Sequence, residues 1–352
     1  MAVTMKDIAT HSGWSLGTVS KVLAKKPGVS SQAKEEILQT AQRLGYQKNE
    51  VASLLRQKHP HGIVLIVRAQ YCPAYSRLAL TLKQKLMAKG YSVRWIEVEY
   101  DEDEIQKALA LQRVQPAALL VFFGARRDVF RKQEGRTLGP ALSIGSEMRG
   151  LNFPWLSSYF WPFSEMSQQA TEWLFETHCK HIGVVMEERF LSDELSDFLL
   201  GIQYGFYSRN QVFRVKDQVA IKPFSLQGGY EGLMELKAKM NHLDGILLFN
   251  SQQALGALRA AHDLNLRIPE DLSILIWDQD QWGGYTIPSL SSFMINEEED
   301  LLEILNMVEK LAHPENLFIT PLHKEASWTM TWRESLRPLK TSKVKEKCFD
   351  SR

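Results

Sequence analysis

Apolar runs that alternate with amphipathic segments over residues 62–332 constrain the fold of this 352-residue chain most strongly. The runs form two series: GIVLIV at 62–67, YSVRWIEV at 91–98, AALLVFF at 117–123 and ALSIG at 141–145, then HIGVVM at 181–186, a short strand near Val219, GILLF at 245–249 and LSILIW at 272–277. Continuous apolar strands separated by helices are typical of parallel sheets buried on both faces. The sequence therefore predicts an α/β core made of two doubly wound parallel sheets.

The two series predict two lobes. Residues 62 to about 160 and a later return at 296–322 would form the first lobe, and residues 163–290 and 323–332 the second. Ligands of such folds bind beyond the carboxyl ends of the strands, here in the cleft between the lobes. The basic residues 333–352 are interpreted as a disordered tail rather than a DNA contact.

Two short amphipathic segments near the start of the chain, at 5–11 and 16–23, predict a helix-turn-helix. Thr4 and Ser15 are hydroxyl residues suited to cap the two helices, and Gly13 permits the positive φ that reverses the chain between them. Val19, Val22 and Leu23 recur at spacings of three and four, so they should face inward. The other face of the second helix carries Leu16, Gly17, Thr18, Ser20 and Lys21.

The alternative to DNA binding is that these are two solvated helices of an ordinary bundle. A third predicted helix runs from Ser30 or Ser31 to Leu44, with an inner stripe of Ile37, Leu38, Ala41 and Leu44. The charge favours DNA: residues 1–60 hold nine Lys or Arg against four Asp or Glu, a balance of +5, although the whole chain is only +1. Positive charge concentrated on a helix-turn-helix is typical of a nucleic-acid-binding module.

The segment MKDIATHSGWSLGTVSKVLAKKPGVSSQAKEEILQTAQRLGYQKNEVASLLR resembles the headpiece and hinge of the LacI/GalR family of bacterial transcription regulators. The resemblance implies a headpiece at 1–48, a hinge helix and linker at 49–61, and an effector-binding, dimerising core at 62–332 that is periplasmic-binding-protein-like. It places Leu16, Gly17 and Lys21 at bases of the major groove and Thr18 and Ser20 at phosphates. It places Leu55 in the minor groove, where the side chain kinks the DNA.

The same resemblance, weaker in the core, implies an effector site. Asn250 in LFNSQQALGALR and Asp278 in IPEDLSILIWD fall on polar ligand contacts, whereas Phe224 and Tyr75 fall on aromatic ones. A carboxylate, an amide and aromatic faces suit a sugar-like effector.

Four positions of the core depart from the family pattern. Phe198 stands where the family often has an arginine, and Pro162 and Phe163 stand where it has an Asp-Asn pair. Arg68 replaces a proline at the end of the first strand, and it either faces an anionic ligand or pairs with a nearby carboxylate. Phe163 and Arg68 are therefore included among the candidate effector contacts.

The resemblance implies a transcription regulator, interpreted as a repressor, that binds a pseudo-palindromic operator as a homodimer, with a tetramer left open. We expect no cofactor, metal site or catalytic residue: the three cysteines are widely spaced, and Asp278, Asp280 and His262 lack a nucleophile motif. The N-terminus carries no signal sequence and no apolar run could span a membrane, which favours a cytoplasmic location over the alternative, a solute-binding protein for transport.

Overall fold

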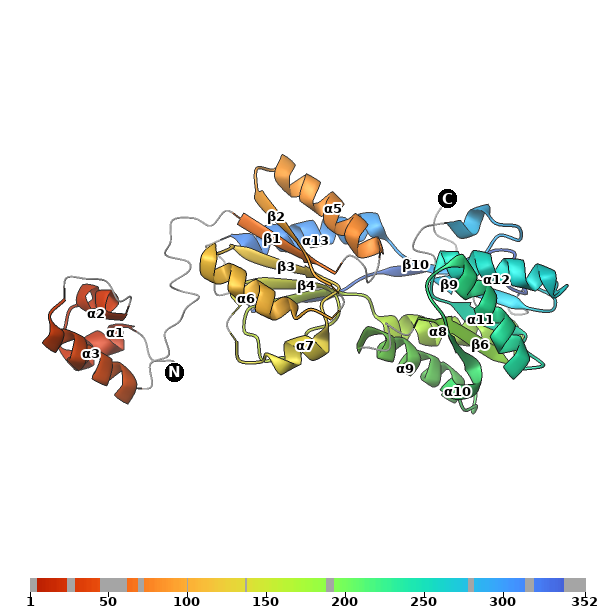
Figure 1. Ribbon diagram of the computed structural model, residues 1–352, viewed down its shortest axis with the longest axis horizontal. Coiled ribbons are helices and arrows are strands. Elements are labelled where there is room, and N and C mark those ends of the chain that lie inside the picture. Colours follow the sequence, from red (N-terminus) through yellow and green to blue (C-terminus); the bar gives the residue numbers. More distant parts are fainter. Residues whose placement is uncertain are drawn as a thin grey trace. The chain divides into compact units, whose positions relative to one another are not determined.

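The computed structural model describes residues 5–23, 29–44, 62–68, 73–99, 101–136, 138–187, 193–277, 282–313 and 320–338. The chain divides into two compact units, residues 1–59 and 60–352, drawn in Figure 1 as a small helical headpiece and a larger α/β core. The predicted hinge at 49–61, including Leu55, and the candidate contact Asp278 lie outside the described residues. None of the helices described is long and apolar enough to span a bilayer.

The headpiece contains α1 (Met5–Ser12), α2 (Leu16–Leu23) and α3 (Ser31–Arg43). Gly13 has a φ of +73° at the turn, as predicted. The Ser15 hydroxyl oxygen accepts the Thr18 amide at 3.1 Å and so caps α2, and the Ser30 hydroxyl caps α3 through the Ala33 amide at 3.3 Å. Hydroxyl caps that satisfy free amides therefore set the start of both helices.

Five side chains form the headpiece core, namely Ile8, Val19, Val22, Ile37 and Ala41, each at most 6% exposed. The prediction that Leu38 belongs to the inner stripe is wrong, because this side chain is 44% exposed. Ile37 and Leu38 are neighbours on a helix and point about 100° apart, so only one of them can face α1 and α2.

The core holds two six-stranded sheets, one in each lobe (Figure 1). The first sheet has the order β11-β5-β4-β3-β1-β2 and the second the order β12-β10-β9-β8-β6-β7. The strands of the first sheet are β1 (Gly62–Val67), β2 (Ser92–Glu97), β3 (Leu119–Phe123), β4 (Ala141–Gly145), β5 (Leu156–Phe160) and β11 (His323–Glu325). Those of the second are β6 (Ile182–Met186), β7 (Val219–Ile221), β8 (Gly245–Leu248), β9 (Ser273–Trp277), β10 (Ser291–Ile295) and β12 (Trp328–Thr331). Among the described strands all pairings are parallel except that of β10 with β12, which confirms the predicted pair of parallel-dominated, doubly wound sheets.

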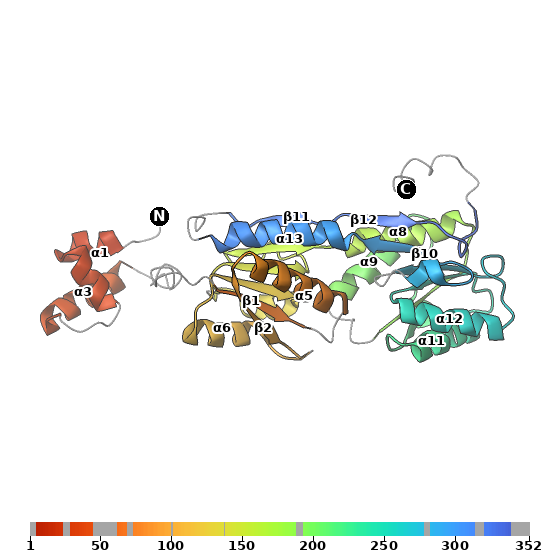
Figure 2. The same cartoon turned by 90° about the horizontal axis from the view of Figure 1, so that it is seen from above.

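Helices cover both faces of each sheet. The first sheet carries α5 (Pro73–Ala88) and α13 (Glu297–Ala312) on one face, side by side in Figure 2, and α6 (Glu104–Val114) and α7 (Arg127–Lys132) on the other. The second carries α8 (Phe163–Glu176) and α9 (Asp193–Tyr207) on one face and α11 (Leu226–Lys239) and α12 (Ser251–Asp263) on the other. Successive residues of β1, such as Ile63 and Val64, enter opposite layers, because side chains alternate along a strand.

Three crossing segments, residues 160–163, 295–297 and 325–328, carry the chain between the lobes. The last crossing comes later than predicted: β11 pairs with β5 of the first sheet, so the chain enters the second lobe after residue 325 rather than at 323.

Residues 333–338, which the sequence assigned to a disordered tail, instead pack on the second lobe. Leu336 is 3% exposed, and the Ser335 hydroxyl donates to the Ile274 carbonyl at 2.6 Å. A buried apolar side chain and a satisfied hydroxyl hold this segment in place.

Candidate DNA-binding surface and effector site

One face of α2 is exposed along the helix. Leu16 is 45% exposed, and Gly17 and Lys21 are also exposed. Val19 and Val22 of the same helix are buried against α1 and α3, so the opposite side of α2 points away from these two helices. The predicted base-contacting residues Leu16, Gly17 and Lys21 therefore share the outer face of α2.

Thr18 and Ser20 are the two predicted phosphate contacts, and the structure describes the side chain of Thr18 alone. The Thr18 hydroxyl is half-buried and bonds the Ser15 hydroxyl at 2.9 Å, so part of its hydrogen-bonding capacity is used to close the first turn of α2. The side chain of Ser20 lies outside the described residues, although its backbone belongs to α2.

Trp14, which the sequence analysis did not single out, fixes the turn ahead of α2. Its indole N–H donates to Glu36 of α3 at 2.8 Å, and this bond is the main reason that the pKa of Glu36 is lowered. A charge-assisted bond between the turn and α3 restricts how α2 can tilt. A tryptophan directly before the cap of the second helix is the signal that could have identified it.

In the core, two predicted contacts lie beyond the carboxyl ends of second-lobe strands, where ligands of such sheets bind. Phe224 is half-buried between β7 and α11. Asn250 caps α12, and its side-chain oxygen accepts the amides of Gln252 at 2.7 Å and Gln253 at 3.3 Å. Among the described residues the Asn250 amide nitrogen has no hydrogen-bond acceptor.

An aromatic cluster fills the neighbouring strand ends and continues into the first lobe. We define it as Tyr75, Trp161, Phe163, Phe198, Phe249 and Trp277, all at most 9% exposed. Phe198 lies at its centre, with ring centroids 4.6 Å from Phe163, 4.5 Å from Phe249 and 5.0 Å from Trp277. Trp161 links this group to Tyr75 of α5 at 5.5 Å, so ring contacts run from one lobe to the other.

The two aromatic departures from the family pattern, Phe163 and Phe198, contact each other. Two phenylalanines that stand where the family has polar residues fill this space with apolar rings. No buried charge is then left there without a partner. The indole N–H of Trp277, which packs 5.2 Å from Phe163, is buried with no acceptor among the described residues. These rings pack against one another, and the Trp277 N–H is a buried donor left without an acceptor in the described part of the chain.

Arg68 pairs with a nearby carboxylate, which is the second of the two alternatives predicted from the sequence. Its guanidinium pairs with Glu104 at 2.6 Å, with both side chains 2% exposed, and it also donates to the backbone carbonyls of Glu99, Glu102 and Gly124. Burial raises the pKa of Glu104, although Arg68 opposes the shift. Arg68 is therefore engaged within the first lobe instead of pointing at a ligand.

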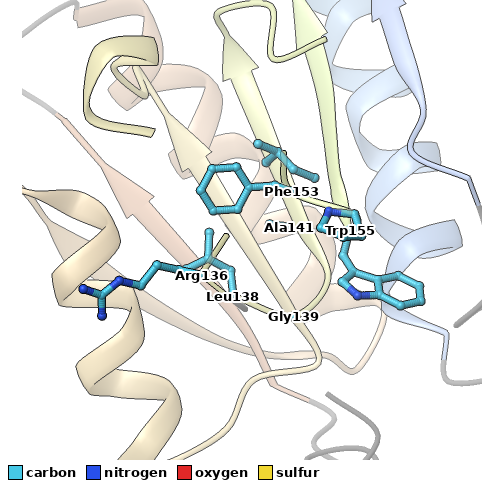
Figure 3. Close-up of a pocket in the computed structure, with 8 residues that line it drawn as sticks. Arg136, Leu138, Gly139, Ala141, Phe153 and Trp155 are labelled. Carbon is cyan, nitrogen blue, oxygen red and sulfur yellow. The ribbon is translucent and has the colours of Figure 1, made fainter. Parts of the chain in front are cut away.

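Two cavities lie at the amino ends of strands, away from the candidate effector site. One of about 40 Å³ borders the start of β4, with Leu138, Ala141 and Phe153 in its wall (Figure 3), and holds little more than one water molecule. Another of about 400 Å³ opens beside Lys180 and His181 at the start of β6. Their position at the amino ends makes them poor candidates for the effector site of such a fold.

Comparison with known families matches both parts of the chain. Residues 4–49 match the family described as bacterial regulatory proteins, lacI family, and residues 176–316 match a periplasmic binding protein-like domain. The fold and site thus define a helix-turn-helix headpiece joined to a two-lobed ligand-binding core. The chain belongs to the lacI family of bacterial regulatory proteins.

Relatives cover most of the chain. A ribose operon repressor from Halalkalibacterium halodurans is 26% identical over 292 residues, 82% of this chain and 84% of that protein. An HTH-type transcriptional repressor PurR from Yersinia enterocolitica is 22% identical over 330 residues, 90% of this chain and 94% of that protein. Among solved structures, the transcriptional regulator CelR in complex with cellobiose has a TM-score of 0.66 at 19% identity, covering 95% of this chain and 99% of that one. The lac repressor dimer bound to operator and the anti-inducer ONPF has a TM-score of 0.65 at 21% identity, with the same coverage.

Proposed function

We propose that this chain is a cytoplasmic transcription repressor that binds a pseudo-palindromic operator as a homodimer, with its affinity set by a small metabolite in the cleft between the lobes. The observation that carries the proposal is the outer face of α2, where Leu16, Gly17 and Lys21 are exposed over a buried Val19 and Val22. That arrangement is what the reading helix of a helix-turn-helix needs. The repressor names of the relatives agree with it.

Base reading is assigned mainly to Lys21. Gly17 has no side chain to reach a base edge, and Leu16 offers only apolar contact, for instance to a thymine methyl. Lys21 is exposed on the same face, and its ammonium can donate to guanine acceptors in the major groove.

Replacing Lys21 by alanine is expected to relax the sequence preference at one base pair per half-site by about 1–3 kcal/mol. The measurement is a selection of binding sites from a randomised duplex pool with wild type and variant. Lys34→Ala is the matched control, because it removes the same charge from the exposed surface of α3. If both variants select the consensus of the wild type, Lys21 contacts only phosphate.

Leu55, which lies outside the described residues, keeps its role as a proposal from the resemblance. A leucine wedged into the minor groove partly unstacks a base step and bends the duplex. Leu55→Ala is therefore expected to lose specific operator binding while keeping salt-dependent non-specific binding. A titration at two ionic strengths measures both, and equal operator affinity for wild type and variant would contradict this role.

The homodimer is proposed because one headpiece contacts too few base pairs for tight specific binding. Two headpieces related by a two-fold axis would read half-sites about one helical turn apart. The choice between dimer and tetramer is decided by light scattering of the full chain with and without operator.

The effector is proposed to be a sugar or sugar derivative that uses the Asn250 amide and stacks on aromatic faces such as Phe224. Relatives named for ribose and a structure with cellobiose agree with this class. A thermal-shift screen of sugars, sugar acids and phosphosugars identifies it, since a ligand at 100 times its Kd adds about 2.7 kcal/mol of stability. The protein is proposed to have no catalytic activity, because its site residues combine donors and aromatic rings without a nucleophile.

A further inference from the structure

Asp300 is a fully buried carboxylate beside two of the three crossing segments. It lies in the first turn of α13, directly after the crossing at 295–297, and is 0% exposed. The three acids before it, Glu297, Glu298 and Glu299, remain at least partly exposed. Burying a carboxylate costs free energy unless the carboxylate is hydrogen-bonded, so the partners of Asp300 indicate its structural role.

The two partners of Asp300 lie at the end of β5, which holds Tyr159, and in the crossing that follows it, which holds Trp161. The Tyr159 hydroxyl donates to Oδ1 at 2.5 Å, and the indole N–H of Trp161 donates to Oδ2 at 2.9 Å. Each carboxylate oxygen therefore accepts one bond. Asp300 thus joins the start of α13 to Tyr159 and Trp161, which are 141 and 139 residues away in sequence. Both joined segments adjoin a crossing from one lobe to the other.

Trp161 connects this carboxylate to the aromatic cluster. Its ring contacts Tyr75 of the first lobe at 5.5 Å and Phe163 of the second lobe at 6.1 Å. A change in how Asp300 holds the indole would consequently reach the rings of the aromatic cluster on both sides of Trp161.

We propose that Asp300 is a proton-controlled latch: its carboxylate ties the end of β5 and the crossing that follows it to the start of α13, and protonation weakens this tie at Tyr159 so that the lobes rearrange in mildly acidic solution. A carboxylate accepts bonds from both donors, whereas a carboxylic acid carries a hydrogen on one oxygen. Once Oδ1 is protonated, that hydrogen and the Tyr159 hydroxyl hydrogen compete for the same short contact. One of the two must turn away, while the bond from Trp161 to Oδ2 remains.

The surroundings of Asp300 place its titration in an accessible range. Burial raises the pKa of Asp300 to about 6; the bonds from Tyr159 and Trp161 oppose the shift, and the nearby Glu299 and Glu297 add to it. The charged groups around it are acids that have partners of their own: Glu297 with Arg77 of α5, Glu303 with Lys324 of β11, and Glu299 with the hydroxyl of Ser327. The same environment raises the pKa of Tyr159, so this hydroxyl keeps its proton throughout.

The test measures the distance between the lobes as a function of pH in the full chain. Labels are attached at Val114→Cys on the first lobe and Tyr207→Cys on the second, two sites that are 88% and 78% exposed. Cys72 and Cys348 are changed to serine, while Cys179 stays because it is buried. Resonance energy transfer is then recorded from about pH 8 to about pH 5.

The wild type is expected to change its interlobe distance with a midpoint near pH 6, and Asp300→Asn is expected to show no such change. Glu298→Gln is the matched control, because it removes an exposed acid from the same turn and should behave as wild type. An unchanged distance in the wild type, or the same transition in Asp300→Asn, would overturn the proposal.

A second variant keeps the proposal testable if Asp300→Asn does not fold. Tyr159→Phe removes one donor to the ionised carboxylate, which should move the transition to higher pH. A midpoint that stays in place in Tyr159→Phe would show that the two crossing segments are not coupled through this bond.

The pH dependence of the free energy of unfolding tests the same titration of Asp300. Because the pKa of Asp300 is higher in the folded chain than its ordinary value of 3.8, folding favours the protonated form. The unfolding equilibrium constant of the wild type should fall by about 50-fold relative to that of Asp300→Asn as the pH decreases from about 7 to about 4. A constant ratio between the two proteins over this window would contradict the assignment of the titration to Asp300.

Discussion

Replacing Glu104 by alanine is expected to lower the free energy of unfolding of the core by about 3–5 kcal/mol. The variant leaves the guanidinium of Arg68, 2% exposed, without its carboxylate partner at 2.6 Å. It also removes the acceptor of the Arg126 amide, which donates to Glu104 at 2.8 Å. A buried charge that loses its counter-ion costs far more than the net contribution of the pair.

Urea unfolding of the full chain, followed by the circular dichroism of the core, measures this loss. Glu97→Ala, an exposed acid at the end of β2, should change the free energy by no more than about 0.5 kcal/mol. The double variant Arg68→Met with Glu104→Leu removes both charges and should recover most of the loss. If the double variant is as unstable as Glu104→Ala, volume rather than unpaired charge dominates at this position.

Phe198→Ala is expected to destabilise the core by a similar amount, about 3–5 kcal/mol. Phe198 is 1% exposed and contacts Phe163, Phe249 and Trp277 at centroid distances of 4.6, 4.5 and 5.0 Å. Truncation removes the ring from the centre of the aromatic cluster, and packed neighbours refill such a space only in part.

The cavity gives this prediction a second measurement. An apolar cavity of this kind binds small aromatic molecules, so benzene should raise the melting temperature of Phe198→Ala and leave that of the wild type unchanged. Tyr207→Ala, on the same helix but 78% exposed, is the control and should lose little stability. A loss below about 1 kcal/mol in Phe198→Ala would show that the cluster is not packed as described.

The sequence predicted the parts of the fold that depend on local pattern. Periodicity and caps located α2 and its exposed face, and continuous apolar runs located β1, β3, β6 and β8. β5 was missed because its residues, LSSYF, include two serines that are buried through tertiary contacts. Their hydroxyls bond His323 and the backbone of Leu322, partners that are about 165 residues away.

The effector site was predicted only in outline. The resemblance placed Asn250 at the end of a strand and Phe224 at an aromatic ligand contact, and in the structure both follow the carboxyl ends of second-lobe strands. Position in the sequence could not tell whether Arg68 faces the cleft or Glu104, because the choice depends on a residue 36 positions away. Asp300 was equally hidden, since it is the last of four consecutive acids and only the helical register buries it.

The measurement that bears most directly on the account is a binding-site selection with the full chain at moderate ionic strength, repeated with the metabolite found in the thermal-shift screen. We expect one enriched pseudo-palindrome that the protein binds well above competitor DNA, with an affinity that changes by about 5- to 150-fold when the metabolite is added. A pool that shows no enriched sequence, with or without the metabolite, would contradict it.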